Sequence, residues 1–293
     1  MSRKKTENLP ELGALLAPRD PLMQVVEQAV LRGTDWPRVS APVADHIAAR
    51  LAGVITLGHA YPGQRLLEQD ISEVLNVSRA PVREALRILE KDRLVEFQPR
   101  RGATVTAENA EELNDIFLVR SLLFDQLLRQ IMADCPEQLQ ALLERYIPIL
   151  EDARAASGEA YSVQSFLLNL EIADLSRSRI INDMLKSVAL RTLRYVRLGR
   201  VTFPDTLSVS MHNWQKLLAA VRARDTDKVL KLAGDQIRKV RDVAVRALEE
   251  RTGAPATGAP ATTAAPAPVR ARSSAPAPKP PGKPSRRSSR ARA

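Results

Sequence analysis

Three arginines stand four residues apart in one short stretch of the chain, and two more follow shortly afterwards. Arg79, Arg83 and Arg87 belong to the run VSRAPVREALRILEK, and the segment QPRRG contributes Arg100 and Arg101. Residues four apart share one face of a helix, so the first three guanidinium groups would project together. A guanidinium can hold a phosphate or a guanine edge through two parallel hydrogen bonds. Most charged helix faces are simply solvated, so this pattern alone leaves solvation and nucleic-acid recognition both open.

The residues around these arginines predict the elements that would position them. VADHIAARLAGVITLG and EQDISEVLNV have the apolar spacing of two helices, with a turn at Pro62 and Gly63 between them. Ser78 is suited to cap a third helix, whose apolar stripe lies opposite the arginines. LVEFQP and ATVTA alternate as two strands around the turn RRG. Three helices and a two-stranded ribbon predict a winged helix-turn-helix, which places one helix in the major groove of DNA.

This stretch resembles the DNA-binding domain of GntR-family bacterial transcription regulators over residues 43–107. GVITLGHAYPGQRLLEQ, VSRAPVREALRIL and LVEFQPRRGATV carry the resemblance. It implies a double-stranded operator as the partner, with DNA contacts from Ser78, Arg79, Ala80, Arg83, Arg87, Arg101 and Gly102. Two positions depart from the family pattern. Ala80 replaces a small hydroxyl residue, and Gln69 stands where many members have an arginine, so the departures concern which operator is read.

The segment after the ribbon predicts one helix after another. Apolar residues at helical spacing indicate helices at 110–133, 136–155, 160–175, 179–200, 207–223 and 226–250. Short loops between them are typical of an all-helical bundle. The bundle resembles the FCD domain, the effector-binding domain of FadR-type members of the same family. NDIFLVRSLLFDQLLRQ, SFLLNLEIADLSRSRIINDMLKSV and WQKLLAAVRARDTDKVLKLAGDQI carry this resemblance, which implies a small-molecule effector inside the bundle.

Many FCD domains bind a divalent metal through one aspartate and three histidines. On this sequence those positions fall at Ser165, Asn169, Trp214 and Gln236. None of these side chains is a good ligand for such a metal, and His212 alone could not replace four ligands. We therefore expect no metal and no other cofactor in this domain.

Arginines offer the bundle another way to bind an anion, because a guanidinium can clamp a carboxylate directly. Helices that line the pocket in the resembling domains supply Arg120, Arg191, Arg194 and Arg197. Surface ion pairing is the alternative for each of them. Arg120 is the strongest candidate because its helix faces the core. We predict effector contacts from Arg120 and Arg194, with Tyr195 and Trp214 as walls. A domain that has lost its effector is the other interpretation.

Positive charge is concentrated at the C-terminus. The net charge is +10, and from Thr252 onwards the chain has eight basic residues and no acidic one, which leaves about +2 on the rest. The Ala/Pro-rich composition of this segment predicts disorder. Its charges could bind DNA phosphates without sequence preference. A nucleoid-associated architectural protein that binds DNA through this tail is therefore the rival function.

Cysteine content and motifs exclude other classes. The single cysteine, Cys135, allows no intramolecular disulfide, and no apolar run reaches membrane-spanning length. A nucleophile elbow, a P-loop and a dinucleotide fingerprint are all missing from the sequence, so we expect no enzyme. We expect a cytoplasmic, nucleoid-associated protein.

Together these patterns predict a mainly α protein in four parts. They are an N-terminal extension (1–38), a winged helix-turn-helix (39–107), a helical effector and dimerisation domain (108–251) and a disordered basic tail (252–293). A homodimer is expected because two recognition helices about one DNA turn apart read a palindrome. We expect a repressor modulated by a small metabolite. The metabolite would be anionic if the arginines of the bundle bind it.

Overall fold

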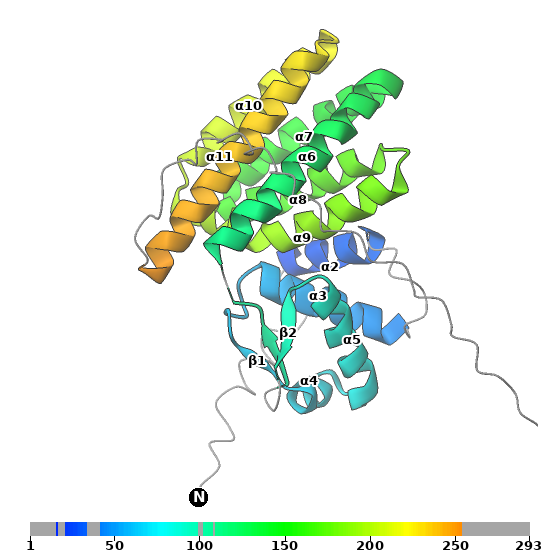
Figure 1. Cartoon of the computed structure of the whole chain (residues 1–293), viewed down its shortest axis with the longest axis vertical. Helices are drawn as coiled ribbons and strands as arrows, with labels where there is room; N and C mark the ends of the chain where they lie inside the picture. The colour runs from blue at the N-terminus through cyan, green and yellow to red at the C-terminus, as the bar shows by residue number, and fades with distance from the viewer. Residues whose placement is uncertain (1–15, 17–20, 34–41, 99–101, 108, 254–293) are drawn as a thin grey trace, which may run out of the picture. The chain divides into compact units, whose positions relative to one another are not determined.

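The computed structural model describes residues 16, 21–33, 42–98, 102–107 and 109–253 of the chain. Within them the predicted mainly α architecture is confirmed, with a winged helix-turn-helix followed by a bundle of helices (Figure 1). The predicted disordered tail lies, after Gly253, outside the described residues. None of the described helices is both long enough and apolar enough to cross a lipid bilayer.

The N-terminal part contains the three predicted helices and a small sheet. Its elements are α2 (Pro21–Gly33), α3 (Pro42–Thr56), β1 (Arg65–Leu66), α4 (Glu68–Leu75), α5 (Arg79–Lys91), β2 (Val95–Gln98) and β3 (Gly102–Val105). Asn76 ends α4 in the left-handed conformation, with φ 52°, and this sharp turn directs the chain into α5. Helix α5 buries Val82, Ala85, Leu86, Ile88 and Leu89 on one face.

The sheet has three strands in the order β1-β3-β2, where the sequence predicted a two-stranded ribbon. β2 and β3 pair antiparallel, with Val95 opposite Val105 and Gln98 opposite Gly102. The two-residue strand β1 pairs with the other edge of β3 through Arg65 and Leu66. The turn predicted at Pro62 and Gly63 is present, with Gly63 at φ 79°. Strand β1 directly after it was not predicted, because a pairing this short has no alternating pattern to detect.

Helix α2 gives the N-terminal extension a structural role that its composition did not indicate. Met23, Val26 and Val30 of α2 are buried in the same core as α3 and α5. Phe166 of α8 and Leu193 of α9 belong to this core as well, and α2 contacts both helices. The helix therefore packs between the DNA-binding part and the bundle.

The bundle follows the predicted helix pattern closely. Its helices are α6 (Ala110–Asp134), α7 (Pro136–Ala156), α8 (Gly158–Asp174), α9 (Arg179–Thr202), α10 (Thr206–Arg222) and α11 (Thr226–Thr252). Asn109, Ser157, Ser178 and Asp225 cap α6, α8, α9 and α11 by accepting hydrogen bonds from first-turn backbone N–H groups. Helices α6 and α11 lie side by side in Figure 1, and both contact α9. Helix α9 also contacts α3, so it borders the DNA-binding part.

Candidate functional site

The solvent face of α5 carries the residues that the arginine spacing predicted to contact DNA. Arg79, Ala80, Arg83 and Arg87 are exposed, and so is Ser78, which precedes the helix in an extended conformation. The Ser78 side chain makes no capping hydrogen bond, so its hydroxyl and the first-turn N–H groups stay available to an anion. Because the apolar residues on the opposite side of α5 are buried in the core, the arginine face of the helix points toward solvent.

Arg83 is held by a carboxylate from the preceding helix. Its Nε and Nη2 atoms donate to the two Glu68 oxygens at 3.0 and 2.8 Å, and the pair is largely exposed. This hydrogen bonding lowers the pKa of Glu68 despite partial desolvation, with further help from the charges of Arg79 and Arg87. Glu68 therefore stays ionised at neutral pH, orients Arg83 and places one negative charge beside the basic face.

Arg87 connects the helix to the ribbon. Its Nη1 atom lies 2.7 Å from a Glu90 carboxylate oxygen, and its guanidinium stacks over the Phe97 ring of β2 at 4.0 Å from the centroid. A cation over an aromatic face contributes about 0.5–1 kcal/mol at an exposed site. Arg87 thus has a structural contact as well as an exposed position, which its spacing alone did not indicate.

The turn of the ribbon contains the remaining predicted DNA contacts. Gly102 is exposed with φ +75°, a left-handed conformation that other residues rarely adopt, and no neighbour would clash with an added Cβ. Arg101 lies outside the described residues. Gln69, which departs from the family pattern, donates to Glu73 at 2.8 Å on the surface of α4.

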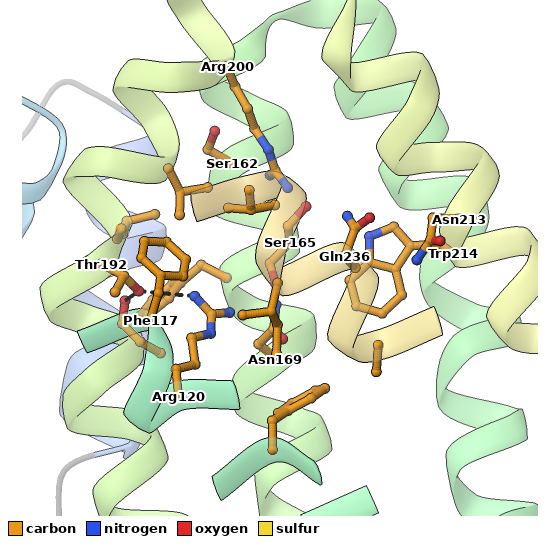
Figure 2. A pocket seen from close by; sticks show the side chains of 18 of the residues that line it. Phe117, Arg120, Ser162, Ser165, Asn169, Thr192, Arg200, Asn213, Trp214 and Gln236 are labelled. Carbon is orange, nitrogen blue, oxygen red and sulfur yellow. Dashed lines mark hydrogen bonds between the residues drawn. The ribbon is translucent and has the colours of Figure 1, made fainter. Parts of the chain in front are cut away.

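A cavity of about 50 Å³ lies inside the bundle among α6, α8, α9, α10 and α11 (Figure 2). Phe117, Phe124 and Leu217 supply part of its apolar wall, and two of the predicted effector contacts, Arg120 and Trp214, line it. The family's metal positions also fall on this wall, at Ser165, Asn169, Trp214 and Gln236. These side chains were selected by the resemblance to the FCD domain, and the structure places them on one cavity wall.

Two guanidinium groups point into this cavity from different walls, as Figure 2 shows for Arg120 and Arg200. Arg120 donates to Thr192 Oγ1 at 3.0 Å. Arg200 is only 6% exposed, and its contacts with Tyr161 O and Ser210 Oγ are both long, at 3.5 Å. Burial lowers the pKa of each arginine to about 10, and the charge of Arg200 adds to the effect on Arg120.

The cavity does not fit the divalent metal that FCD domains commonly bind. Its wall, in the part of the chain that the structure describes, has no carboxylate, imidazole or thiol. Among the described residues, no group of three or more His, Cys, Asp or Glu side chains is placed to hold a metal ion. Two buried guanidinium charges would also repel a divalent cation.

Arg194 and Tyr195, predicted as effector contacts, line a different part of the molecule. Arg194 donates to the Thr106 carbonyl at 3.0 Å and to the Tyr195 hydroxyl at 2.6 Å, beside the end of the ribbon. Neither residue is on the wall of the bundle cavity. Arg200 is there instead, and the sequence reasoning missed it. It follows Thr192 and Val196 at four-residue steps, so the cavity face of α9 could have been traced to it.

Comparison with known proteins identifies the two parts. The model of bacterial regulatory proteins of the gntR family matches residues 43–105, and the FCD domain model matches residues 115–238. The chain is a GntR-family protein with an FCD domain. Its domains are those of DNA-binding transcriptional regulators.

Named relatives of this GntR-family protein are transcription regulators. YdhC of Bacillus subtilis, an uncharacterized HTH-type transcriptional regulator, is 27% identical over 143 residues, which is 47% of this chain and 63% of YdhC. The HTH-type transcriptional regulator McbR of Escherichia coli is 28% identical over 185 residues, covering 59% of this chain and 79% of McbR. The gluconate operon transcriptional repressor of Bacillus licheniformis is 25% identical over 196 residues, covering 63% and 78%.

The solved structure of E. coli McbR/YncC has the same fold. It superposes with a TM-score of 0.63 at 22% sequence identity, covering 70% of this chain and 98% of that chain. At 22% sequence identity the superposition shows that the two proteins share a fold, and nothing about their ligands.

Proposed function

We propose that this GntR-family protein is a transcriptional repressor that binds a palindromic operator as a homodimer and responds to a small metabolite bound in the bundle. The observation that carries this proposal is the exposed arginine face of α5, positioned by a helix-turn-helix and flanked by a ribbon. The relative named as a gluconate operon repressor supports repression as the output.

In this proposal Arg79 and Arg83 enter the major groove with the N-terminal end of α5. Ser78 and the free N–H groups of the first turn hold a phosphate. Arg101 and Gly102 lie along the backbone at the ribbon turn, where the open space around Gly102 allows close approach. Ala80 presents only a methyl group, so base reading falls mainly on the arginines.

Exposed apolar side chains on the bundle support dimerisation. Leu118, Val119 and Leu122, within five residues of each other on α6, are exposed, and Leu122 is 64% exposed. Monomeric proteins rarely leave large apolar patches in water. A twofold axis beside α6 would bury these side chains against their copies and present two α5 helices to the DNA.

Helix α9 offers a route from the cavity to α5. One face lines the cavity through Thr192, and the adjacent Arg191 pairs with Glu112 at 2.7 Å. Glu112 also lies 3.8 Å from Arg93, just after α5. A ligand that moves α9 would therefore change the support of α5. The ligand can change DNA affinity only as far as it binds more tightly to one position of α9 than to the other. Such a difference is commonly about 1–3 kcal/mol.

Asp92, which directly follows α5, accepts a second contact from the same helix. Ser187 Oγ of α9 donates to Asp92 Oδ1 at 3.1 Å. Helix α9 thus reaches the C-terminal end of α5 directly through Ser187 and, one helical turn later, indirectly through Arg191 and Glu112 of α6. These contacts support the proposal that α9 transmits the bound state.

A mobility-shift experiment tests the DNA-binding part of the proposal. The full-length protein, Arg79→Ala/Arg83→Ala and a chain ending at Arg251 are compared on fragments of the protein's own upstream DNA at about 150 mM salt. Arg129→Ala/Arg145→Ala, which removes two exposed arginines from the bundle, is the matched control. We expect a discrete complex that the first double substitution abolishes, while the control and the shortened chain keep it.

The opposite outcome would favour the architectural function. In that case all DNA fragments shift equally, the α5 substitutions have no effect, and the shift disappears with the tail. Where the expected discrete complex is found, sedimentation of the protein with and without a duplex that carries this site tests whether two chains bind per palindrome, as the dimer proposal requires.

A further inference from the structure

The cavity in the bundle carries positive charge with no acidic partner. Within the described residues, Arg120 and Arg200 form no ion pair with a carboxylate, although both guanidinium groups face the same small space. The indole Nε1 of Trp214 is buried there as well and has no hydrogen-bond partner among the described residues. Arg120 donates to Thr192, and Arg200 has two long hydrogen bonds and lies 4.6 Å from the centroid of the Tyr161 ring, but these groups are neutral and do not balance the charges. Buried charges without a counter-charge are costly, which is why proteins seldom retain them without a reason.

These groups share one chemical preference. Guanidinium and indole N–H groups only donate hydrogen bonds, so their missing partner has to accept them. The cavity of about 50 Å³ has room for only a few water-sized groups, since one water needs about 10–15 Å³. A carboxylate head group meets both conditions, because it is small, charged and accepts several bonds.

A second cavity continues from the first. Its volume is about 270 Å³, and the two share the lining residues Val196, Arg200, Gln236 and Val240. Val209 and Val243 add apolar wall to the second cavity, and its remaining lining residues are polar or charged: Thr206, Ser210, Lys239 and Asp242. Arg200 therefore lies on the walls of both the small inner cavity and the larger outer one. An organic acid could place its head group inside and its hydrocarbon body outside.

We infer that the bundle binds an aliphatic carboxylic acid without a metal, with the carboxylate bridging Arg120 and Arg200 and the hydrocarbon chain in the outer cavity. Trp214 Nε1 is a third donor to the carboxylate. The two guanidinium groups take the place of the metal that other FCD domains use to hold an anion. This inference rests on the proposed function, since it names the ligand class of the same regulatory site.

A series of straight-chain acids tests the inference on the full-length protein. Binding of acetate, butyrate, hexanoate and octanoate is measured by isothermal titration calorimetry in buffer with EDTA, and 1-hexanol is the uncharged probe. We expect affinity to rise about fourfold for each added methylene until the outer cavity is filled. We expect 1-hexanol to bind at least tenfold more weakly than hexanoate, and EDTA to have no effect.

Substitutions identify the residues responsible. Arg120→Gln and Arg200→Gln should each weaken hexanoate binding about ten- to a hundredfold, since each removes a charged hydrogen-bond donor. Arg129→Gln, on the exposed surface of the same helix as Arg120, is the matched control and should bind normally. Circular dichroism establishes that each variant is folded before its affinity is compared.

Three results would overturn the inference: equal binding of hexanoate and 1-hexanol, binding that requires an added divalent metal, or no binding of any acid. The failure of this inference can be distinguished from the failure of the proposed function. Discrete DNA complexes without acid binding would reject only the ligand class. Acid binding without a sequence-specific DNA complex would reject the regulator and retain the ligand site.

Discussion

Replacing Arg120 by methionine should make the ligand-free protein more stable. Burial and the nearby charge of Arg200 lower the pKa of Arg120 to about 10, while an unperturbed arginine titrates above about 12. Because one pKa unit corresponds to about 1.4 kcal/mol, the protonated side chain costs the folded protein about 3 kcal/mol. Losing the hydrogen bond to Thr192 costs about 1 kcal/mol. Thr192 keeps its own bond to the Ala189 carbonyl. The net gain is about 2 kcal/mol.

The pH dependence of this gain has a defined sign. Since the folded-state pKa of Arg120 lies below the unfolded-state pKa, the unfolded chain binds more protons between them, and the wild type gains stability as pH rises above about 10. Arg120→Met cannot gain in this way. The stability difference between the variant and the wild type should therefore be constant below about pH 9 and shrink at higher pH.

Urea unfolding followed by circular dichroism measures this difference at one fixed protein concentration, because a dimer's stability depends on concentration. The expected result is a higher midpoint with an unchanged dependence on urea, and a melting temperature raised by about 4–8 °C. Arg129→Met should change stability by less than about 0.5 kcal/mol. A loss of about 1 kcal/mol or more in Arg120→Met, at every pH, would mean that Arg120 is a satisfied structural residue and not an unpaired ligand contact.

Four further results are expected. Glu68→Gln should strengthen non-specific DNA binding and steepen the log–log salt slope by about 1, measured by fluorescence anisotropy, because it removes a negative charge beside Arg83. Gly102→Ala should cost about 1 kcal/mol in urea unfolding, since alanine is strained at φ +75°. Leu122→Asp should convert dimers to monomers in sedimentation experiments. Ending the chain at Arg251 should flatten the salt slope by about 3–4 units if about four tail charges contact DNA; an unchanged slope would mean that the tail is only solvated.

The helices were predictable from the sequence because their apolar spacing repeats over many turns. Helix α9, predicted at 179–200, spans Arg179–Thr202, and Ser178 caps it. Strand β1 was not predictable, since Arg65 and Leu66 are too short a run to show alternation. The role of α2 was not predictable either, because only its neighbours in the fold reveal that Met23 and Val26 belong to a core shared with α3, α5, α8 and α9.

The cavity residues came from the resemblance to the FCD domain, which assigned Arg120 to a pocket-lining helix and Trp214 to a metal position. The structure places both side chains on the cavity wall. The prediction chose Arg194 on α9, although four-residue steps from Thr192 and Val196 lead to Arg200 and leave Arg194 on another face. The pairing of Arg83 with Glu68 was also hidden, since it depends on the angle between α4 and α5.

Helix α9 has the cavity on one face and the DNA-binding part on another. Under the proposed function, ligand choice and regulatory output can therefore evolve independently. Trp214 of α10 and Ile237 of α11 line the cavity, whereas the contacts with Thr106 and Asp92 come from α9. Substitutions in α10 and α11 can therefore change which molecule is sensed while the α9 contacts stay intact. The same arrangement makes this chain a scaffold for engineered biosensors, in which the cavity is redesigned and the reporter promoter is kept.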